Sequence, residues 1–452
     1  MDCGGRLAAH AGDDRLIGWL LCRRALQGLP DGGWAAGKVV GLALVAWLSW
    51  IVPSIGLVPS HAGTTVVCLG LLAGLAGILT LRFREEAEAQ VRARWRTMLG
   101  FESLFLTLFA GYCLLRSANP DMWQPYWGGE KPMELAFING VLRSSALPPY
   151  DPWFSGGYIN YYYYGQWIAA TLMRLSSVGP QYGFNLALAS VFALTGLTAA
   201  SVGYYTASAW RTWARVLVGG ITLVFVLILG NLASVGQLWR SLRTGAEFHF
   251  WDSTRVIPGT INEFPFFTFL YGDLHAHMIA LPLGLAVLLL AVYLFLDERT
   301  SFRQELQIAA LAGLLTGAAA VTNPWDAPGY GGMFLLALVG RLARNRGGLV
   351  SKGVRLVAAG GLFGGVAALA YAPFFASFKS FYSEVGLVAD PTPLPEFLTV
   401  LGLYLFHART LRGCSTAQGS RDRRALAAAL IVVLFATWRG GPCSASCSAS
   451  CC

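Results

Sequence analysis

Residues 278–296 read MIALPLGLAVLLLAVYLFL, an apolar run without a single charge. A helix needs about 20 mainly apolar residues to cross the hydrocarbon core of a bilayer, so this run predicts a transmembrane helix. Similar runs recur at 38–57, 62–81, 97–116, 183–208, 214–236, 306–322, 328–341, 356–378, 395–408 and 425–438. The pattern predicts an all-α polytopic membrane protein with about 10 or 11 transmembrane helices. Residues 165–180 are too short to span, and we expect a helix lying along the membrane surface there.

The composition indicates the same class. Of the 452 residues, 55% are hydrophobic and only 13% are charged, and the mean hydropathy is +0.53. A soluble domain carries about 25% charged residues, so a soluble enzyme, a disordered chain and a fibrous repeat are excluded. The cysteines show no spacing typical of zinc or redox sites, and no disulfide framework is expected.

Basic residues are concentrated in alternate loops. Most of the 33 Lys and Arg residues lie at 1–38, 82–96, 209–215, 297–305, 341–355 and 409–424. Basic loops remain on the cytoplasmic side, which predicts a multi-pass protein of the cell membrane with the lipid bilayer as its partner. The net charge of +9 is therefore a topology signal, and nucleic acid is not an expected partner. Acids and histidines gather in the other loops, so we expect any chemistry on the extracytoplasmic face.

The first outer loop, residues 117–164, contains several groups that could take part in chemistry. Glu130, Lys131 and Glu134 open a predicted helix that runs to about residue 144, and Asp151 follows it. Glu130 and Glu134 are four residues apart and share one helix face. Such acids can serve as a general base and as a clamp for a metal or a substrate. Alternatively, the acids cap the helix start, where the dipole favours them, and the tyrosine run 161–164 forms an aromatic belt at the membrane surface.

The second outer loop, residues 237–277, ends in an Asp-x-His-x-His motif made of Asp273, His275 and His277. Ionisable groups at the edge of the bilayer are costly unless they pair or bind something. The motif can supply metal ligands or hold a phosphate. The alternative is a hydrogen-bonded polar plug between helices. A third outer turn contains Asn323 and Asp326, and there the alternative is a proline-bounded turn whose side chains bond to their own backbone.

Several longer motifs occur in order along the chain. They are Asn119-Pro120-Asp121, Gly129-Glu130-Lys131-Pro132-Met133, Pro148-Pro149-Tyr150-Asp151-Pro152-Trp153, Asn160-Tyr161-Tyr162-Tyr163-Tyr164-Gly165, Phe264-Pro265-Phe266-Phe267, Gly272-Asp273-Leu274-His275 and Thr322-Asn323-Pro324-Trp325-Asp326. Across residues 28–407 the chain resembles the YYY family of membrane proteins (Chlor_Arch_YYY, domain of unknown function 2298). That family looks like a member of the GT-C superfamily of polytopic glycosyltransferases, which includes the protein O-mannosyltransferases and the catalytic subunit of oligosaccharyltransferase.

The resemblance implies a GT-C-like fold in which the large first outer loop contains short helices. It also implies sugar transfer from a polyprenyl-phosphate carrier on the outer face. In such enzymes an acid of the first outer loop acts as base or metal ligand, which corresponds here to Glu130 with Glu134. Asp151-Pro152-Trp153-Phe154 is similar to the Asp-Pro-Trp-Phe stretch of the oligosaccharyltransferase subunit.

The expected organisation has three parts: a cytoplasmic N-terminal segment at 1–37, a transmembrane domain at 38–408 and an atypical tail at 409–452. Family members begin with a further hydrophobic segment and continue well past position 410. Here residues 1–27 are too polar to span, and the cysteine-rich tail is similar to a shifted reading frame. Both ends are therefore expected to be incomplete.

The functional hypothesis is a membrane glycosyltransferase that takes a sugar from a polyprenyl-phosphate donor and transfers it to a glycan, lipid or protein acceptor. Its predicted catalytic acids are Glu130, Glu134 and Asp151. The residues predicted to contact phosphate or sugar are Lys131, Trp153, Asn160, Tyr161, Tyr162, Arg255, His275, His277, Asn323 and Asp326. A divalent cation, Mg²⁺ or Mn²⁺, is a candidate cofactor, with Asp273 as a ligand together with Asp151 or Glu130.

Two other classes remain as alternatives: a polytopic transporter, and a non-catalytic membrane protein that binds lipid or glycan. Transporters place polar residues inside the spans, often on broken helices in repeated halves. Here the predicted spans contain almost no charge apart from Glu102, and no repeated half is visible. The pattern favours chemistry at the membrane surface over transport.

Overall fold

The computed structural model describes residues 16–123, 129–380 and 391–402. Within these ranges the chain is helical, and the only extended pairing is an isolated bridge between Tyr150 and Tyr158. The helices are α2 (Trp34–Ser54), α3 (Ala62–Arg82), α4 (Arg84–Ala118), α5 (Lys131–Arg143), α6 (Tyr164–Ser176), α7 (Pro180–Thr206), α8 (Thr212–Leu227), α9 (Leu232–Thr244), α10 (Pro265–Tyr271), α11 (Ala276–Leu296), α12 (Phe302–Thr322), α13 (Asp326–Arg344), α14 (Leu349–Leu369) and α15 (Ala372–Ser377), with a 3₁₀ turn at Asp252–Thr254. Residues 16–22 and 394–402 are also helical.

Seven helices in the described ranges are long and apolar enough to cross a membrane, namely α2, α3, α4, α7, α11, α12 and α14. An eighth span results if α8 and α9 are counted as one. The predicted class, an all-α polytopic membrane protein, is confirmed. The run predicted at 328–341 lies in α13, a helix of 19 residues packed against α11 and α14. The run at 425–438 lies outside the described residues, and the one at 395–408 is described only to residue 402.

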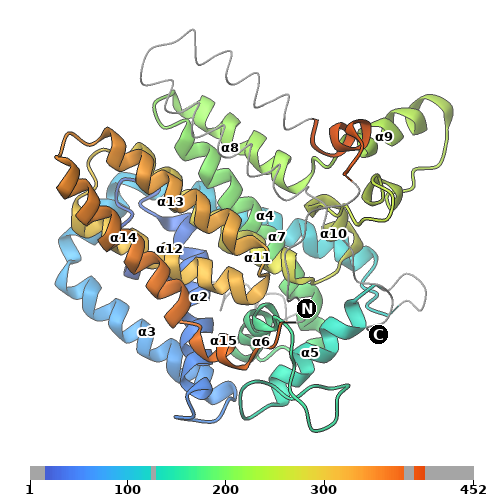
Figure 1. Ribbon diagram of the computed structural model, residues 1–452, viewed down its shortest axis with the longest axis horizontal. Coiled ribbons are helices and arrows are strands. Elements are labelled where there is room, and N and C mark those ends of the chain that lie inside the picture. The colour runs from blue at the N-terminus through green and yellow to red at the C-terminus, as the bar shows by residue number, and fades with distance from the viewer. Residues whose placement is uncertain (1–15, 124–128, 381–390, 403–452) are drawn as a thin grey trace.

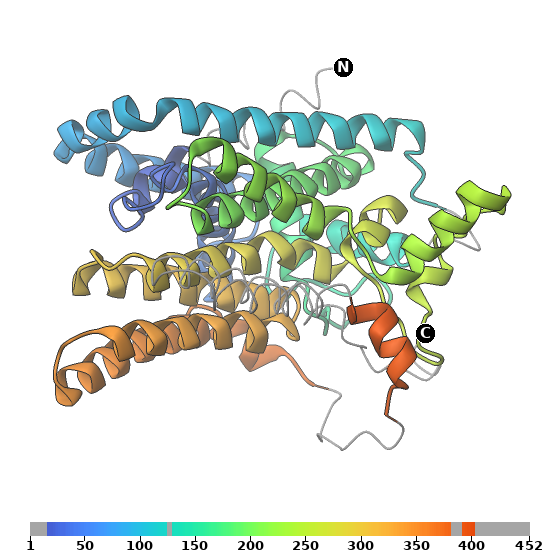
Figure 2. The same cartoon turned by 90° about the horizontal axis from the view of Figure 1, so that it is seen from above.

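Helix α11 forms the centre of the bundle. Its sequence is apolar on all sides, and almost the whole helix is buried against α7, α12 and α13. Figure 2 shows the bundle as successive layers, from α4 along one edge, through α7, α8 and α11, to α13 and α14 along the other. The most hydrophobic run of the sequence is therefore the core of the protein.

Helix α4 extends beyond the predicted span. The basic stretch 82–96, expected as a cytoplasmic loop, is helical from Arg84 and joins the apolar run in one helix of 35 residues. Side chains four residues apart support its polar half through ion pairs, Arg84 to Glu88 at 2.6 Å and Glu88 to Arg92 at 3.7 Å. Hydropathy reports where a helix leaves the bilayer, and not where the helix itself ends.

Helix α6 corrects another expectation. Residues 165–180 are predicted to lie along the membrane surface, but α6 is buried over its whole length among α2, α3, α5 and α7. Trp167 donates its indole N–H to the Ala46 carbonyl of α2 at 3.0 Å, and the Arg174 guanidinium donates to the Val141 carbonyl of α5 at 3.0 Å. The polar side chains of α6 form hydrogen bonds with protein groups and not with water. A helix at the membrane surface and a helix buried in the protein can have the same spacing of polar and apolar residues, so the sequence does not distinguish them.

The predicted span at 214–236 is broken. Helix α8 ends at Leu227, α9 begins at Leu232, and the two meet at an angle of 89°. The Asn231 side chain accepts a hydrogen bond from the Ser234 N–H at 3.2 Å and so caps the start of α9. This local signal starts a new helix within a stretch whose hydropathy is continuous.

The acid inside the predicted spans is paired. Glu102 of α4 forms an ion pair with the buried Lys38 of α2 and accepts a hydrogen bond from Trp34 Nε1 at 3.1 Å. A charge in a spanning helix is tolerated when it has such partners. This pair joins two helices and needs no transported ion to explain it.

Helices α5, α9 and α10 gather at one end of the bundle (Figure 1). This is the end at which α4 terminates and α11 begins. The Tyr112 hydroxyl of α4 donates to the Phe269 carbonyl of α10 at 2.7 Å and ties the short helix to the span. The residues predicted for the functional site converge here.

Candidate functional site

The site is built around the first turn of α5. Gly129, with a φ of 60°, turns the chain into the helix, and Pro132 lies in its first turn. The helix begins and ends close to the predicted positions. Glu130 precedes it, but its side chain makes no capping hydrogen bond and instead forms an ion pair with Nε2 of His275. The capping alternative therefore does not account for this acid.

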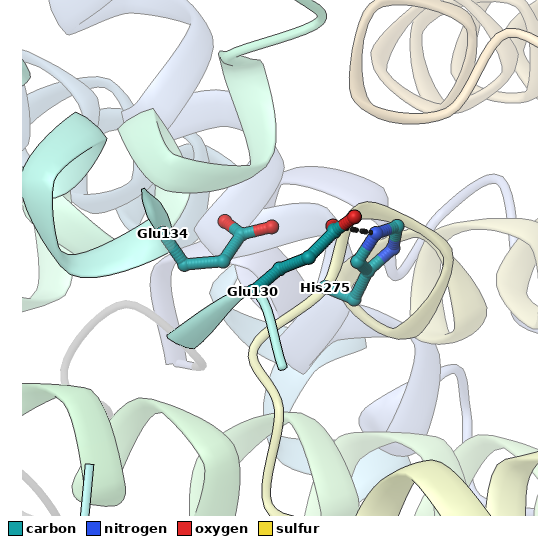
Figure 3. Close-up of side chains that lie close together, drawn as sticks. All are labelled: Glu130, Glu134 and His275. Carbon is teal, nitrogen blue, oxygen red and sulfur yellow. Dashed lines mark ion pairs between the residues drawn. The ribbon is translucent and has the colours of Figure 1, made fainter. Parts of the chain in front are cut away.

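Three side chains from two distant segments meet here. One oxygen or nitrogen of each of Glu130, Glu134 and His275 lies within 4.8 Å of the others. Figure 3 shows the two carboxylates, one helical turn apart, directed toward the imidazole that precedes α11. Glu130 is half exposed, whereas Glu134 is fully buried and accepts a hydrogen bond from Nε2 of Gln166 on α6.

A second imidazole supports the first. His275 Nδ1 lies 3.1 Å from His277 Nδ1, and His277 Nε2 lies 3.1 Å from the Thr268 hydroxyl. The Thr268 hydroxyl donates to the Phe264 carbonyl at 3.4 Å. One assignment of protons satisfies every contact: His275 donates from both nitrogens, to Glu130 and to His277, and His277 donates to Thr268. The chain of contacts directs Nε2 of His275 toward the acids.

Pairing and burial determine the charges of the site. The hydrogen bond from His275 lowers the pKa of Glu130, so this carboxylate is ionised at neutral pH. Burial alone would lower the pKa of His275, but the hydrogen bond and charge of Glu130 raise it to about 10. Burial raises the pKa of Glu134 to about 8 and that of Asp273 to about 6. An ionised, accessible acid thus lies beside buried acids that hold their protons more tightly.

Two buried cations border the acids. Lys131 lies with its ammonium 4.4 Å from the ring centre of Tyr271. Arg116, at the end of α4, is buried so close to Gly272 that a Cβ there would lie 2.5 Å from the guanidinium. Arg116 donates to Asn185 Oδ1 at 2.8 Å and to a backbone carbonyl. Among the described residues neither cation has a carboxylate at ion-pair distance. Burial and the charge of Arg116 lower the pKa of Lys131.

Asp151 does not join this cluster. Its Oδ1 accepts hydrogen bonds from the N–H groups of residues 153 and 154, at 2.8 and 3.1 Å, and so stabilises a turn. The neighbouring backbone packs on Gly140 of α5. Gly140 is ten residues beyond Glu130, which is about 15 Å along a helix. Asp273 lies within electrostatic reach of Glu130, but it is not among the three side chains whose candidate ligand atoms come together, so the expected ligand pair of Asp273 with Glu130 stays a prediction.

Two of the predicted aromatic residues lie beside the site. Trp153 and Tyr161 both contact the ring of Phe137 on α5, each at a centroid distance of 5.6 Å. Trp153 is largely exposed, and Tyr161 stacks on Tyr162 at 3.8 Å. Burial, followed by the charges of Tyr162 and Glu134, raises the pKa of Tyr161, which places it within electrostatic reach of the acids.

The end of the tyrosine run is not an aromatic belt. Tyr163 and Tyr164 are buried, and Trp50 Nε1 donates to the Tyr163 hydroxyl at 3.3 Å. Asn160 exchanges hydrogen bonds of 2.8 and 3.0 Å with the backbone of Lys379. These residues anchor the loop to the protein.

Arg255 does not contact Lys131 directly, because the rings of Trp251 and Tyr271 lie between them. Its guanidinium stacks over Trp251 at 4.6 Å, and Trp251 contacts Tyr271 at 5.9 Å. The ring of Tyr271 in turn contacts the ammonium group of Lys131. Arg255 is therefore near the site without contacting its acids.

At the turn between the two helices, Asn323 follows the end of α12 and Asp326 begins α13, and both are buried, although Trp325 between them is exposed. Thr322, just before this turn, packs against Gly165, where a Cβ would lie 3.0 Å from its methyl group. Gly165 precedes Gln166, so the turn borders the buried side of the site.

Three residues of the site were not singled out from the sequence: Arg116, Gln166 and Tyr271. Arg116 ends an apolar run, where a basic residue is ordinary. Gln166 lies in a helix expected at the membrane surface. A polar amide in an otherwise apolar helix is a signal that could have identified it.

Comparison with known proteins identifies one family. A model of the family described as "Uncharacterized membrane protein (DUF2298)" matches residues 44–445, a range that includes every residue of the candidate site. No curated protein and no solved structure matches the chain.

Proposed function

This chain belongs to the DUF2298 family of uncharacterized membrane proteins, and we propose that it is a membrane glycosyltransferase. It transfers a sugar from a polyprenyl-phosphate donor to an acceptor on the extracytoplasmic face of the cell membrane. The likeness of its motifs to GT-C enzymes suggests this class, and the charges around α5 support it.

The observation that carries the proposal is the pair of buried cations beside an ionised acid. Lys131 and Arg116 have no carboxylate at ion-pair distance among the described residues. Lys131 contacts Tyr271, Arg116 contacts the adjacent Gly272, and the two cations are within electrostatic reach of each other. A buried cation is costly unless an anion compensates it. A phosphate group can bind both, and the half-exposed Glu130 directly precedes Lys131 in the chain.

In the proposed reaction, an acceptor hydroxyl oxygen attacks the anomeric carbon as the bond from that carbon to the phosphate oxygen breaks. Glu130 takes the acceptor proton, and the configuration inverts. Lys131 and Arg116 stabilise the negative charge of the departing polyprenyl phosphate. The exposed ring of Trp153 provides a surface on which the sugar stacks.

The test is a transfer assay on membranes that contain the chain, with radiolabelled polyprenyl-phosphate sugars. We expect Glu130→Gln to lower the rate by about 10²- to 10⁴-fold, because the amide cannot accept the proton. Asp151→Asn is the matched control, because an asparagine oxygen can accept the same turn hydrogen bonds. Transfer that persists in Glu130→Gln would exclude this acid as the base.

The rival classes give different results. A transporter would move labelled lipid or sugar across vesicles without forming a glycosylated product. A binding protein would retain the donor without turnover. Labelled product from the unaltered chain contradicts both.

A further inference from the structure

We propose that Glu130, Glu134 and His275 form a binding site for a divalent first-row transition-metal ion. The ligands are one oxygen from each carboxylate and Nε2 of the imidazole. The inference stands apart from the transferase activity, because metal content can be measured without any substrate.

The distances fit a single ion. The three candidate ligand atoms lie within 4.8 Å of one another. Bonds from Zn²⁺ to imidazole nitrogen and carboxylate oxygen are about 2.0–2.2 Å long, so ligands on opposite sides of an ion are about 4.2 Å apart. Figure 3 shows that the side chains already point toward a common space.

Two of the three ligands, His275 and Glu134, are oriented by a partner behind them. His277 accepts from Nδ1 of His275 and leaves Nε2 directed at the acids. Gln166 donates to Oε2 of Glu134 and leaves its other oxygen available. Metal-binding imidazoles and carboxylates are held in this way in established sites.

Three acceptor atoms of residues near the cluster lack a donor. Oε1 of Glu134, Oε1 of Gln166 and Oδ1 of Asp273 are buried, and none has a hydrogen-bond partner among the described residues. Glu134 and Gln166 are fully buried, and Asp273 is 6% exposed. Buried acceptors are normally paired, so a concentration of unpaired ones indicates a cation.

The ligand types restrict the choice of metal. Mg²⁺, Ca²⁺ and Mn²⁺ are suited to oxygen ligands, whereas imidazole favours the later ions of the row, Fe²⁺, Co²⁺, Ni²⁺ and Zn²⁺. Three protein ligands also leave a position open for water or an acceptor hydroxyl. Glu130 is half exposed, so the open position faces solvent. Such an ion would make a water or hydroxyl bound at the open position more acidic.

The experiment measures metal in the purified full-length protein. The chain is isolated in detergent without a nickel column, stripped with a chelator, and exposed to micromolar Zn²⁺ or Co²⁺. Elemental analysis should find about one ion per chain. The visible spectrum of the Co²⁺ form should show the absorption of a low-symmetry site with nitrogen and oxygen ligands.

Two variants and one control locate the ion. His275→Ala and Glu134→Gln should each reduce binding to background, and His249→Ala should retain it, because His249 is an exposed imidazole paired with Glu247 elsewhere. If a variant elutes as aggregate, competition between Mg²⁺ and Co²⁺ on the unaltered protein provides the second measurement, and Co²⁺ should win. The proposal is overturned if the unaltered chain binds no ion, if His275→Ala binds as much, or if Mg²⁺ displaces Co²⁺ at equal concentration. Metal bound without transfer activity would refute the proposed function alone.

Discussion

His277 lies behind His275, and the orientation of the ligand depends on it. The two Nδ1 atoms are 3.1 Å apart, and the far nitrogen of His277 is held by Thr268. An imidazole without this partner can rotate about its side-chain bonds and lose the direction of Nε2. At the scale of the residue, the Asp-x-His-x-His motif therefore contains one ligand and one positioning residue.

We expect His277→Ala to weaken metal binding by about 10- to 100-fold, which is typical for the loss of such a partner. The glutamine variant should recover part of the affinity, because its amide oxygen can accept from Nδ1 of His275. Titration of the stripped protein with Co²⁺ measures both variants. A purely structural role would instead lower the midpoint of thermal unfolding and leave the affinity of the folded fraction unchanged.

At the scale of the element, α9 is an amphipathic helix with no buried residue. Its exposed apolar residues lie on one face: Leu232, Val235, Leu238, Trp239 and Leu242. Arg243 covers the Trp239 ring at 4.8 Å, and Arg240 adds a second charge. The angle of 89° between α8 and α9 means that, if α8 crosses the bilayer, α9 runs parallel to its surface. Such a helix buries its apolar face at the boundary of headgroups and acyl chains.

A spin label introduced at position 242 as an unnatural amino acid tests this placement. In vesicles that contain anionic lipid, the label should be more accessible to oxygen than to a water-soluble nickel chelate. A label at the exposed position 240, about 160° around the helix from position 242, should show the reverse order. Equal accessibility of both positions to the chelate would mean that α9 does not lie in the interface.

At the scale of the whole molecule, a buried acid joins the helices at the end away from the site. Glu305 of α12 is fully buried and forms ion pairs with Arg341 of α13, at 3.4 Å, and with Arg355 of α14. Arg341 also donates to the carbonyl of Leu294, the third-last residue of α11, at 3.0 Å. Glu305 and Thr322 mark the two ends of α12, about 25 Å apart along the helix. The cluster therefore holds four helices together without contacting the site.

Glu305→Gln should cost about 3–5 kcal/mol of stability, because it leaves two arginines without their buried counter-ion. The midpoint of thermal unfolding in detergent should fall, whereas metal content and transfer at low temperature should stay unchanged. Glu85→Gln, an exposed acid in the first turn of α4, is the control and should have little effect. Loss of metal together with stability would show that the two ends of the bundle are coupled.

The sequence by itself determined the class of the protein. Apolar runs must be helices in a bilayer, because no water is present to bond an exposed backbone. The start of α5 was equally readable, since Pro132 and the acids of a first turn are local signals. The sequence did not reveal the break between α8 and α9. Its local signal is one capping residue, Asn231, whereas the hydropathy of residues 214–236 is an average over many residues and stays apolar across the break.

Only the tertiary structure decided the composition of the site. Glu134, Gln166 and His275 are far apart in sequence, and their meeting depends on how α5, α6 and α11 pack. The same packing assigned Asp151 to a turn and buried α6. Periodicity specifies which face of a helix is polar, but it does not state whether that face meets water or another side chain. That choice is made by long-range contacts, and it is the physical reason why the spans were predictable and the site was not.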